Sequence, residues 1–465
     1  MNNQITIKSL GAAGTVTGSK HLLATPEVTV LIDCGLFQGL KTLRNKNREA
    51  LPVDAAKIDV LLLTHAHLDH CGYIPLLVKN GFTGKIYVTA PTMDLTEIIL
   101  RDSAKIQEEE AQFANEGGYS KHKPALPLYT TEDVERALPR FVIVEHSEVV
   151  QLSNNVSFQF RKNGHILGSC SIQMTCYDKQ IVFSGDIGRN NSRFLLPPAA
   201  LEGADYVIME STYGDRLHPD MDPLDQLAKV INEAIEDHGA VIIPSFAVGR
   251  AQEIMHLINL LKKEGTIPSW IPVFLDSPMA ANATDILCKY PKWHKLTKEE
   301  CNSVCNDVVI NRDFHNTRNI IEKKGPKIII SASGMLTGGR ILEYMKFLAP
   351  VKKNTVLLIG YQAEGTRGRA LQNNAHELKI RGAYVPIRCK VVEITGLSGH
   401  ADQKELLLWL KQFEKRPTQV FLVHGEPASQ AAFKLKIEYE FKWKVKIPKE
   451  NEESVLFEIK EPAHA

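Results

Sequence analysis

The segment IDVLLLTHAHLDHCG, residues 58–72, places three histidines and an aspartate directly after a short apolar run. The run is apolar on both faces and has the length of a strand, which predicts a buried central strand. In an extended loop after that strand, residues two apart point the same way, so His65 and His67 can share one metal ion. The chain then turns into a helix, which lets Asp69 and His70 face a second metal ion. Neutral imidazole and carboxylate together are a ligand set for zinc.

The alternative for this segment is a chance cluster of polar residues at a strand end. Four potential ligands fall within the six residues His65–His70, and the offset of each one suits a metal ion. This density favours a metal site over a chance cluster.

Composition predicts a soluble protein with more than one domain. The 465 residues are too many for one ordinary core, so we expect two or three domains. Hydrophobic residues make up 44% of the chain and charged residues 23%, which is typical of globular proteins. The apolar runs are too short to span a membrane. The formal net charge of +1 gives little attraction for polyanions at long range, so a bound nucleic acid needs a local basic groove.

The eight cysteines are scattered, without a CxxC pair, and the first residues lack a basic segment followed by an apolar one. Free thiols are typical of a reducing compartment. Without a recognisable signal peptide, the expected location is the cytoplasm.

The distribution of apolar residues changes along the chain. Strand-like alternation dominates the first part, with one long amphipathic helix predicted over residues 93–114. From about residue 206, short buried strands alternate with helices of period 3.6, which predicts βαβ units and a mostly parallel sheet. Strand and helix then follow each other twice more after about residue 390.

Further single residues sit in order at predicted strand ends. HAHLDH resembles the HxHxDH signature of the metallo-β-lactamase superfamily. Asp33 in LIDCG, His165 in NGHILGS and Asp186 in FSGDIG are similar to that superfamily's first, third and fourth motifs. The resemblance implies an α/β fold, a four-layer αββα sandwich.

The chain also resembles the β-CASP nucleases, which carry an inserted Rossmann-like domain. Glu210 in IMESTYGD, His400 in GLSGHAD and His424 in FLVHGE are similar to motifs A, B and C of that group. In particular, the chain resembles bacterial homologues of the endonuclease subunit of the polyadenylation machinery. The expected division is a first metallo-β-lactamase part at 1–215, a β-CASP domain at 216–394 and a second metallo-β-lactamase part at 395–465.

The resemblance implies two zinc ions per chain and assigns their ligands. The first zinc is held by His65, His67 and His165, the second by Asp69, His70 and His424, and Asp186 lies between the two. Two cations so close together lower the pKa of a bridging water and neutralise phosphate oxygens.

The catalytic residues that the resemblance implies are His400, Glu210 and Asp69. His400 is the candidate acid for the leaving oxygen, and the carboxylate of Glu210 fixes its tautomer and raises its basicity. The alternative for this pair is a purely structural contact. Asp33 is expected to orient a ligand histidine from outside the metal centre.

A substrate phosphate is expected at SASGMLTGG, residues 331–339, where small residues and exposed N–H groups precede a predicted helix over 341–348. Ser331, Ser333 and Gly334 are the candidates there, and a tight structural turn is the alternative. Arg367, Arg369 and Arg250 are candidates for further phosphate contacts, although isolated arginines are often surface residues or ion-paired.

The resemblance points to single-stranded RNA as the substrate. The RNA-directed branch of the β-CASP group has a histidine at motif C, as His424 here, where the DNA-repair branch usually has valine. RNase J, a relative that is also a 5′ exonuclease, carries an additional C-terminal domain, for which the roughly forty residues after His424 leave no room. A DNA-directed nuclease, a non-catalytic RNA-binding scaffold and a small-molecule hydrolase are the alternatives. Endonuclease or exonuclease mode and the oligomeric state stay open, with a homodimer as one candidate and no membrane partner expected.

Overall fold

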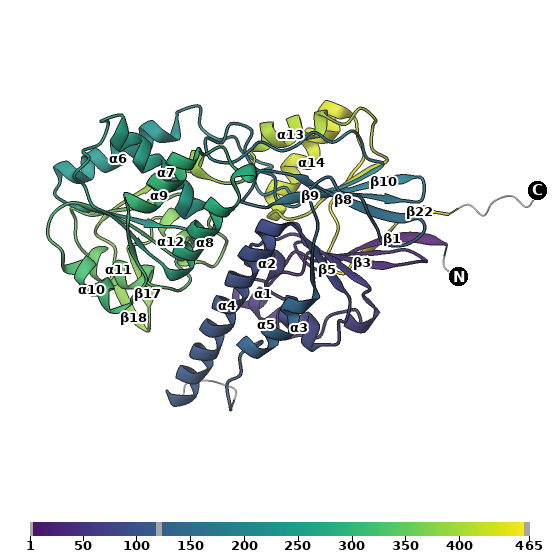
Figure 1. Cartoon of the computed structure of the whole chain (residues 1–465), viewed down its shortest axis with the longest axis horizontal. Coiled ribbons are helices and arrows are strands. Elements are labelled where there is room, and N and C mark those ends of the chain that lie inside the picture. The colour runs from purple at the N-terminus through teal and green to yellow at the C-terminus, as the bar shows by residue number, and fades with distance from the viewer. Residues whose placement is uncertain (1–2, 118–122, 460–465) are drawn as a thin grey trace, which may run out of the picture.

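A computed structural model describes residues 3–117 and 123–459 of the chain. Two seven-stranded sheets face each other, and helices cover the outer side of each sheet (Figure 1). A third, six-stranded sheet lies beside this sandwich with helices on both of its faces. The predicted fold, an αββα sandwich with an inserted Rossmann-like domain, is confirmed.

The first sheet pairs the first and the last strand of the described chain. Its strands run in the order β22-β1-β2-β3-β4-β5-β6, and β1 pairs antiparallel with β22. The bounds are β22 (Glu453–Glu458), β1 (Gln4–Ser9), β2 (His21–Ala24), β3 (Thr29–Ile32), β4 (Val60–Leu62), β5 (Lys85–Val88) and β6 (Phe141–Ile143). The helices of this half are α1 (Lys41–Lys46), α2 (Leu68–Cys71), α3 (Ile74–Lys79), α4 (Ala90–Glu116) and α5 (Thr131–Ala137).

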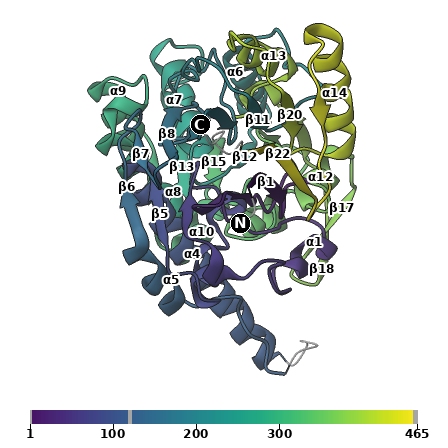
Figure 2. The ribbon, with the colours of Figure 1, turned by 90° about the vertical axis from the view of Figure 1, so that its right-hand side faces the viewer.

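The second sheet has the order β21-β20-β11-β10-β9-β8-β7. The bounds are β21 (Val445–Lys446), β20 (Gln419–Leu422), β11 (Tyr206–Met209), β10 (Lys179–Phe183), β9 (Cys170–Cys176), β8 (Val156–Lys162) and β7 (Val150–Gln151). Two helices cover its outer face, α13 (Gln403–Lys411) and α14 (Pro427–Phe441), as Figure 2 shows from the side.

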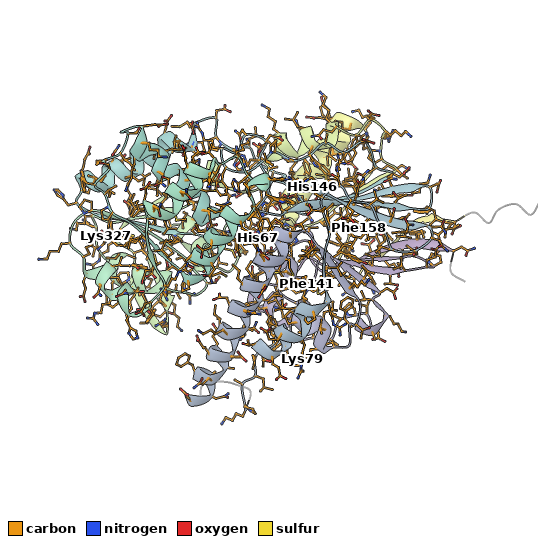
Figure 3. All side chains as sticks on the ribbon, viewed as in Figure 1. His67, Lys79, Phe141, His146, Phe158 and Lys327 are labelled. Carbon is orange, nitrogen blue, oxygen red and sulfur yellow. The ribbon has the colours of Figure 1, made fainter. Side chains whose placement is uncertain are left out.

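The core between the two sheets follows from alternation along the strands. On β8 every second residue is buried, and Phe158 (Figure 3) and Phe160 belong to the same buried apolar cluster as Ile32 of β3 and Leu62 of β4. The Phe158 ring packs edge-on against Tyr87 of β5, with ring centroids 5.4 Å apart. Each fully buried apolar side chain of this kind contributes about 1.5–3 kcal/mol. The period-2 pattern therefore fixes which faces meet.

The third sheet is entirely parallel, with the order β14-β13-β15-β12-β16-β19. The bounds are β12 (Ala240–Pro244), β13 (Val273–Asp276), β14 (Val309–Asn311), β15 (Lys327–Ser331), β16 (Thr355–Leu358) and β19 (Lys390–Glu393). The helices are α6 (Pro223–Glu236), α7 (Arg250–Lys263), α8 (Pro278–Lys289), α9 (Lys298–Asn306), α10 (His315–Glu322), α11 (Ile341–Leu348) and α12 (Arg367–Gln372). A separate hairpin joins β17 (Glu377–Ile380) to β18 (Ala383–Pro386).

Burial on both faces explains why the strands of the third sheet read as continuous apolar runs. Ile242 of β12 packs on the side of α11, and its neighbour Ile243 packs with α6, α7 and α8 on the other side. Parallel strands end at the same edge of a sheet, so the loops after β12, β15 and β16 gather at one edge. The helices predicted over 93–114 and 341–348 are present as α4 and α11. None of the described helices is long and apolar enough to cross a membrane.

Lys327 caps the end of α10 from inside the domain that holds the parallel sheet (Figure 3). Only 3% of the residue is exposed, and its ammonium donates to the carbonyls of Ile320, Ile321 and Lys323. Burial lowers the pKa of Lys327 to about 8. The buried cation thus satisfies three carbonyls that α10 leaves free at its C-terminal end.

We predict that Lys327→Met lowers the free energy of unfolding by about 1–3 kcal/mol, because buried carbonyls lose their donor. The pKa of Lys327 is lower in the folded chain than in the unfolded chain, so the unfolded chain binds more protons between about pH 8 and 10.5. The free energy of unfolding of the wild-type protein should therefore rise, relative to that of the variant, as the pH increases from about 8 to 10.5. Denaturant unfolding at several pH values measures the difference. The exposed neighbour Lys324, changed to methionine, is the control, and an equal loss in both variants would contradict the capping role.

Candidate metal centre

The candidate ligands come from loops at one edge of the two facing sheets. His65 lies three residues after β4, and His67 is the residue before α2. Asp186 follows β10, and His424 follows β20. Because β10, β11 and β20 are parallel neighbours, the loops after them meet at the same edge.

One group joins His65, His67, His165 and Asp186, whose ligand atoms all lie within 4.8 Å of one another. The Nδ1 atom of His67 is 3.1 Å from Nε2 of both His65 and His165. The Oδ2 atom of Asp186 is 3.5 Å from His65 Nε2 and 3.6 Å from His165 Nε2. Four ligand atoms therefore converge on one point.

A second group joins Asp69, His70 and His424 within the same limit. The two Nε2 atoms of His70 and His424 are 3.2 Å apart, and Asp69 Oδ2 is 3.4 Å from His424 Nε2. The other oxygen of Asp186, Oδ1, is 3.4 Å from both His70 Nε2 and His424 Nδ1. Asp186 thus turns one carboxylate oxygen toward each group.

The candidate ligand atoms are better satisfied by bound cations than by hydrogen bonds among themselves. Among the described residues, the buried Oδ1 atom of Asp186, which faces the second group, has no hydrogen-bond partner. Burial lowers the pKa of His65 and His165 well below the ordinary value, and that of His67 to about 4, which favours the neutral ring that binds metal. Burial opposes a charge on His70, but the carboxylates of Asp186 and Asp33 raise its pKa well above the ordinary value. Positive charge is therefore favoured at the second group.

Outer residues fix the orientation of the rings. Asp33 Oδ2 lies 2.7 Å from His70 Nδ1, while Asp33 Oδ1 accepts a hydrogen bond from the backbone of Thr64 at 2.8 Å. The Thr212 hydroxyl lies 3.2 Å from His424 Nδ1. A ring whose second nitrogen is occupied in this way has a fixed tautomer. Asp33 lies where the sequence places it, against a candidate ligand histidine.

His400 and Glu210 lie side by side at the edge of the first group. His400 Nδ1 is 3.1 Å from Glu210 Oε2, and the His400 and His165 ring centroids are 4.5 Å apart. Burial lowers the pKa of His400, but the Glu210 carboxylate outweighs it and raises that pKa overall. Glu210 is 1% exposed and also accepts from the backbone N–H of Ile187. The pair can therefore hold a proton next to the metal groups.

Three residues missed in the sequence lie around this arrangement. His218 Nε2 lies 3.0 Å from the carbonyl oxygen of His400, and Asp402 accepts from the backbone N–H of His218. The ring of Phe246 lies 6.1 Å from that of His67. His218 follows Glu210 by only eight residues, which is the only sequence signal that links it to the site.

A cavity of about 20 Å³ lies beside the second group, with room for a single water molecule. Its polar lining includes His21, Asp33, His70, Asp186, Glu210 and His424.

Three family models together match most of the chain. They are the metallo-beta-lactamase superfamily at residues 17–245, the Beta-Casp domain at 251–371 and the Zn-dependent metallo-hydrolase RNA specificity domain at 384–448. A similar protein, "Ribonuclease TTHA0252" of Thermus thermophilus, is 36% identical over 90% of this chain and 93% of its own length. The chain belongs to the β-CASP family of the metallo-β-lactamase superfamily.

Other β-CASP relatives have different names. An "RNase J-like protein" of Methanocaldococcus jannaschii is 36% identical over 91% of this chain and 92% of its own length. The "Transcription termination factor FttA" of the same organism is 32% identical over 96% of this chain and 70% of its own length. A solved structure, "Crystal Structure of a Protein of Unknown Function from Enterococcus faecalis V583", has 12% identity and a TM-score of 0.53 over 97% of this chain and 100% of its own, which supports the fold alone. Membership of this family identifies the chain as a metal-dependent hydrolase.

The serine-rich loop of the β-CASP domain is only partly open to a substrate. Ser331 is 1% exposed, and its hydroxyl donates to the carbonyl of Asp276 at 2.8 Å. Gly334 is buried, and a Cβ there would lie 2.8 Å from the Phe246 ring. Ser333 is half-buried and accepts from the backbone N–H of Thr337 at 2.9 Å. Of the three candidates for a phosphate contact, Ser333 is therefore the most accessible.

The arginine candidates have partners within the protein. Arg250 is 8% exposed and pairs with Glu253. Arg369 donates to Glu426 at 2.9 Å. Arg367 donates to three backbone carbonyls, and no carboxylate of the described chain is paired with it. We therefore retain Arg367 as a candidate for a phosphate contact and interpret Arg250 and Arg369 as structural.

Proposed function

We propose that this chain is a two-zinc phosphodiesterase that hydrolyses single-stranded RNA. The observation that carries the proposal is the pair of ligand groups with the Asp186 carboxylate between them. A shared carboxylate between two sets of imidazoles is the arrangement that holds two divalent cations side by side. The ligands would be His65, His67 and His165 for one zinc and Asp69, His70 and His424 for the other.

The protein residues around the proposed metals have separate roles. Two zinc ions, when bound, supply positive charge at the phosphate and lower the pKa of water. Asp33 keeps the His70 ring in one orientation, and Asp69 completes the second group next to the reacting phosphate. His400 holds a proton at Nε2 for the leaving oxygen, while the Glu210 carboxylate accepts from Nδ1. This division of roles places the acid beside the metal centre and leaves it outside the ligand set.

Two observations favour RNA over the other substrates: the histidine at motif C and the names of the similar proteins. The histidine at motif C, His424, resembles the RNA-directed branch, and two of the relatives are named ribonucleases. A scaffold subunit is disfavoured because all seven ligand positions hold a ligand residue. A small-molecule hydrolase is disfavoured because the β-CASP domain lies over the site, with Phe246 against His67. A DNA-directed nuclease is the second candidate.

The domain boundaries at 1–215, 216–394 and 395–465 stay part of this proposal. All six strands of the parallel sheet lie between Ala240 and Glu393, inside the middle segment. The first matched family model ends at residue 245 and the last one begins at residue 384, so the models divide the chain at other positions. A cytoplasmic location is a separate expectation from the sequence, and a homodimer is one candidate for the oligomeric state.

The test of the proposed function is cleavage of end-labelled single-stranded RNA and of DNA with the same sequence. We expect RNA to be cut and DNA to be cut much more slowly, and a chelator should stop both reactions. Higher salt should weaken RNA binding, because phosphate contacts release counterions. The product ladder distinguishes internal cuts from stepwise removal of 5′ nucleotides. Equal or faster cleavage of DNA would favour the second candidate.

A further inference from the structure

The two domains touch each other where two basic helices begin. Gly39 and Leu40 immediately precede α1, and Glu364 and Gly365 shortly precede α12. A Cβ on Gly39 would lie 2.6 Å from the carbonyl oxygen of Glu364, and a Cβ on Gly365 would lie 2.7 Å from a Leu40 methyl group. Both glycines have a φ of +77°, a conformation that other residues rarely adopt. The close contact therefore brings the first turns of α1 and α12 together across the domain boundary.

Cations from both domains gather at this contact. Lys41 and Arg44 on α1 are exposed, and neither makes an ion pair with a described residue. Arg367, the first residue of α12, donates only to backbone carbonyls. Burial lowers the pKa of Arg367, and the positive charge of Arg44 lowers it further, which places the two guanidinium groups within electrostatic reach. Arg44 and Arg367 thus lie close together, and Lys41 lies one turn before Arg44 on the same face of α1.

An exposed aromatic side chain lies next to these cations. The carbonyl of Lys379 on β17 accepts from Arg367 Nε at 2.6 Å. Lys379 is the direct cross-strand partner of Tyr384 on β18, and its ammonium lies 5.8 Å from the centre of the tyrosine ring. Tyr384 is 64% exposed. Figure 2 shows α1, α12, β17 and β18 on the same side of the molecule.

A chain of contacts through the protein links these residues to the metal centre. Arg367 Nη1 donates to the carbonyl of Thr337 at 3.2 Å, and Thr337 N–H donates to the Ser333 hydroxyl at 2.9 Å. A Cβ on the glycine after Ser333 would lie 2.8 Å from the ring of Phe246. That ring lies 6.1 Å from the His67 ring. A chain of direct contacts therefore runs from a proposed zinc ligand to the basic helices.

We propose that Lys41, Arg44, Arg367, Lys379 and Tyr384, the rim surface, bind single-stranded RNA outside the metal centre. The cations contact successive phosphates and the tyrosine ring stacks on a base, the combination that holds single strands without reading their sequence. This inference rests on the proposed function and adds the course of the strand to it. With a formal net charge of only +1, the chain needs such a local basic surface for RNA.

Carboxylates border the rim surface on two sides. Glu364 pairs with Arg369, and its side chain stays 62% exposed. Glu110 on α4 is close enough to Arg44 for the guanidinium to lower its pKa, although burial raises that pKa overall. These acids disfavour phosphates on either side of the surface, so the strand is directed over α1 and the hairpin.

The test compares the double variant Lys41→Ala, Arg44→Ala with the matched control Lys352→Ala, Lys353→Ala. The control lysines are exposed and precede β16, so they lie at the edge of the parallel sheet away from the metal centre. Two substrates are used, a single-stranded RNA that extends well beyond the cleft and bis(p-nitrophenyl) phosphate, which is too small to reach the rim surface. The rate on RNA divided by the rate on the small diester removes any change at the metal centre itself.

We expect the rim variant to lower this ratio and to weaken RNA binding, whereas the control keeps the wild-type ratio. The magnitude of the slope of log binding constant against log salt should fall by about 0.7 for each phosphate contact removed from a single strand. Tyr384→Ala should weaken RNA binding between about fivefold and a hundredfold with a nearly unchanged salt slope.

The outcomes separate this inference from the proposed function. If the wild-type protein hydrolyses the small diester but never cuts RNA, the proposed function is wrong and the rim surface loses its basis. If the wild-type protein cuts RNA while the rim variant matches the control in ratio and salt slope, the inference is overturned and the RNA assignment stands. A loss shared by rim and control variants would indicate a general charge effect and would also overturn the inference.

Discussion

The double variant His67→Ala, Asp69→Ala should lose zinc and should lose at least about a thousandfold in the rate of RNA cleavage. Each substitution removes a ligand from a different group, so both zinc sites are affected. The wild-type protein is expected to contain two zinc ions per chain. Elemental analysis of purified protein measures the metal, and cleavage of single-stranded RNA measures the rate.

A matched control for this experiment is His376→Ala, Asp220→Ala, which changes the same residue types at exposed positions. The control should keep both metals and the wild-type rate. A wild-type protein that reproducibly holds no zinc, or a metal content that the ligand substitutions leave unchanged, would rule out the dinuclear site. A content of one zinc per chain would retain the first group and reject the shared role of Asp186.

His400→Ala and His424→Ala should both be nearly inactive on RNA, for different reasons. His424 Nε2 lies 3.2 Å from His70 Nε2, so its removal should lower zinc occupancy of the second group. His400 contacts Glu210 and lies beside the ligands, so its removal should leave both metals in place. The expected loss for His400→Ala is about 10²–10⁴-fold, the usual contribution of a positioned proton donor.

The substrate's leaving group distinguishes an acid from a structural residue. Bis(p-nitrophenyl) phosphate releases an oxygen that needs no proton, so the defect of His400→Ala should shrink on this substrate. The defect of His424→Ala should persist there, because a missing metal affects every phosphodiester. Zinc loss from the His400 variant would indicate a ligand. An equal defect on both substrates would indicate a structural role.

Local patterns predicted much of the fold, because each one has a direct geometric consequence. The run before His65, which is apolar on both faces, predicted a buried strand, which is β4, an interior strand of its sheet. Alternating short strands and helices after residue 206 predicted the parallel sheet, because parallel strands need crossover helices. The first of these strands, β11, was assigned wrongly, since it lies in the second sheet of the sandwich. The helix predicted over residues 341–348 is α11, with the same bounds.

The site residues converge because the strands before them are neighbours in a sheet, and the spacing of the residues along the sequence does not reveal this. Asp186 and His424 are 238 positions apart, and local sequence gives no reason for them to meet. Each one follows a strand, and β10, β11 and β20 are neighbours in one sheet, so the fold brings their loops together. The residues that carry the resemblance gather at one place.

Contacts with backbone carbonyls and with distant carboxylates could not be predicted. Arg369 looked free to bind a phosphate, yet Glu426 pairs with it from 57 positions away. His218 had no recognisable motif of its own, and its role depends on a carbonyl 182 positions away. Ser331 ends a buried strand, and its burial depends on the packing of Asp276 from a neighbouring strand. Such partners are set by the tertiary fold, so a single residue type in a loop does not reveal them.

The site and the first sheet both join residues from the two ends of the chain, since β1 pairs with β22. This arrangement has a consequence for the protein during its synthesis. A ribosome releases the chain from the N-terminus, so the His65–His70 loop emerges long before His424 does. If the seven residues bind zinc as proposed, an unfinished chain lacks a ligand of the second ion until nearly all of it has been translated. The partner strand of β1 emerges later still. A growing polypeptide would then be unable to cleave the messenger RNA that encodes it, and cleavage would begin only after the chain has been synthesised.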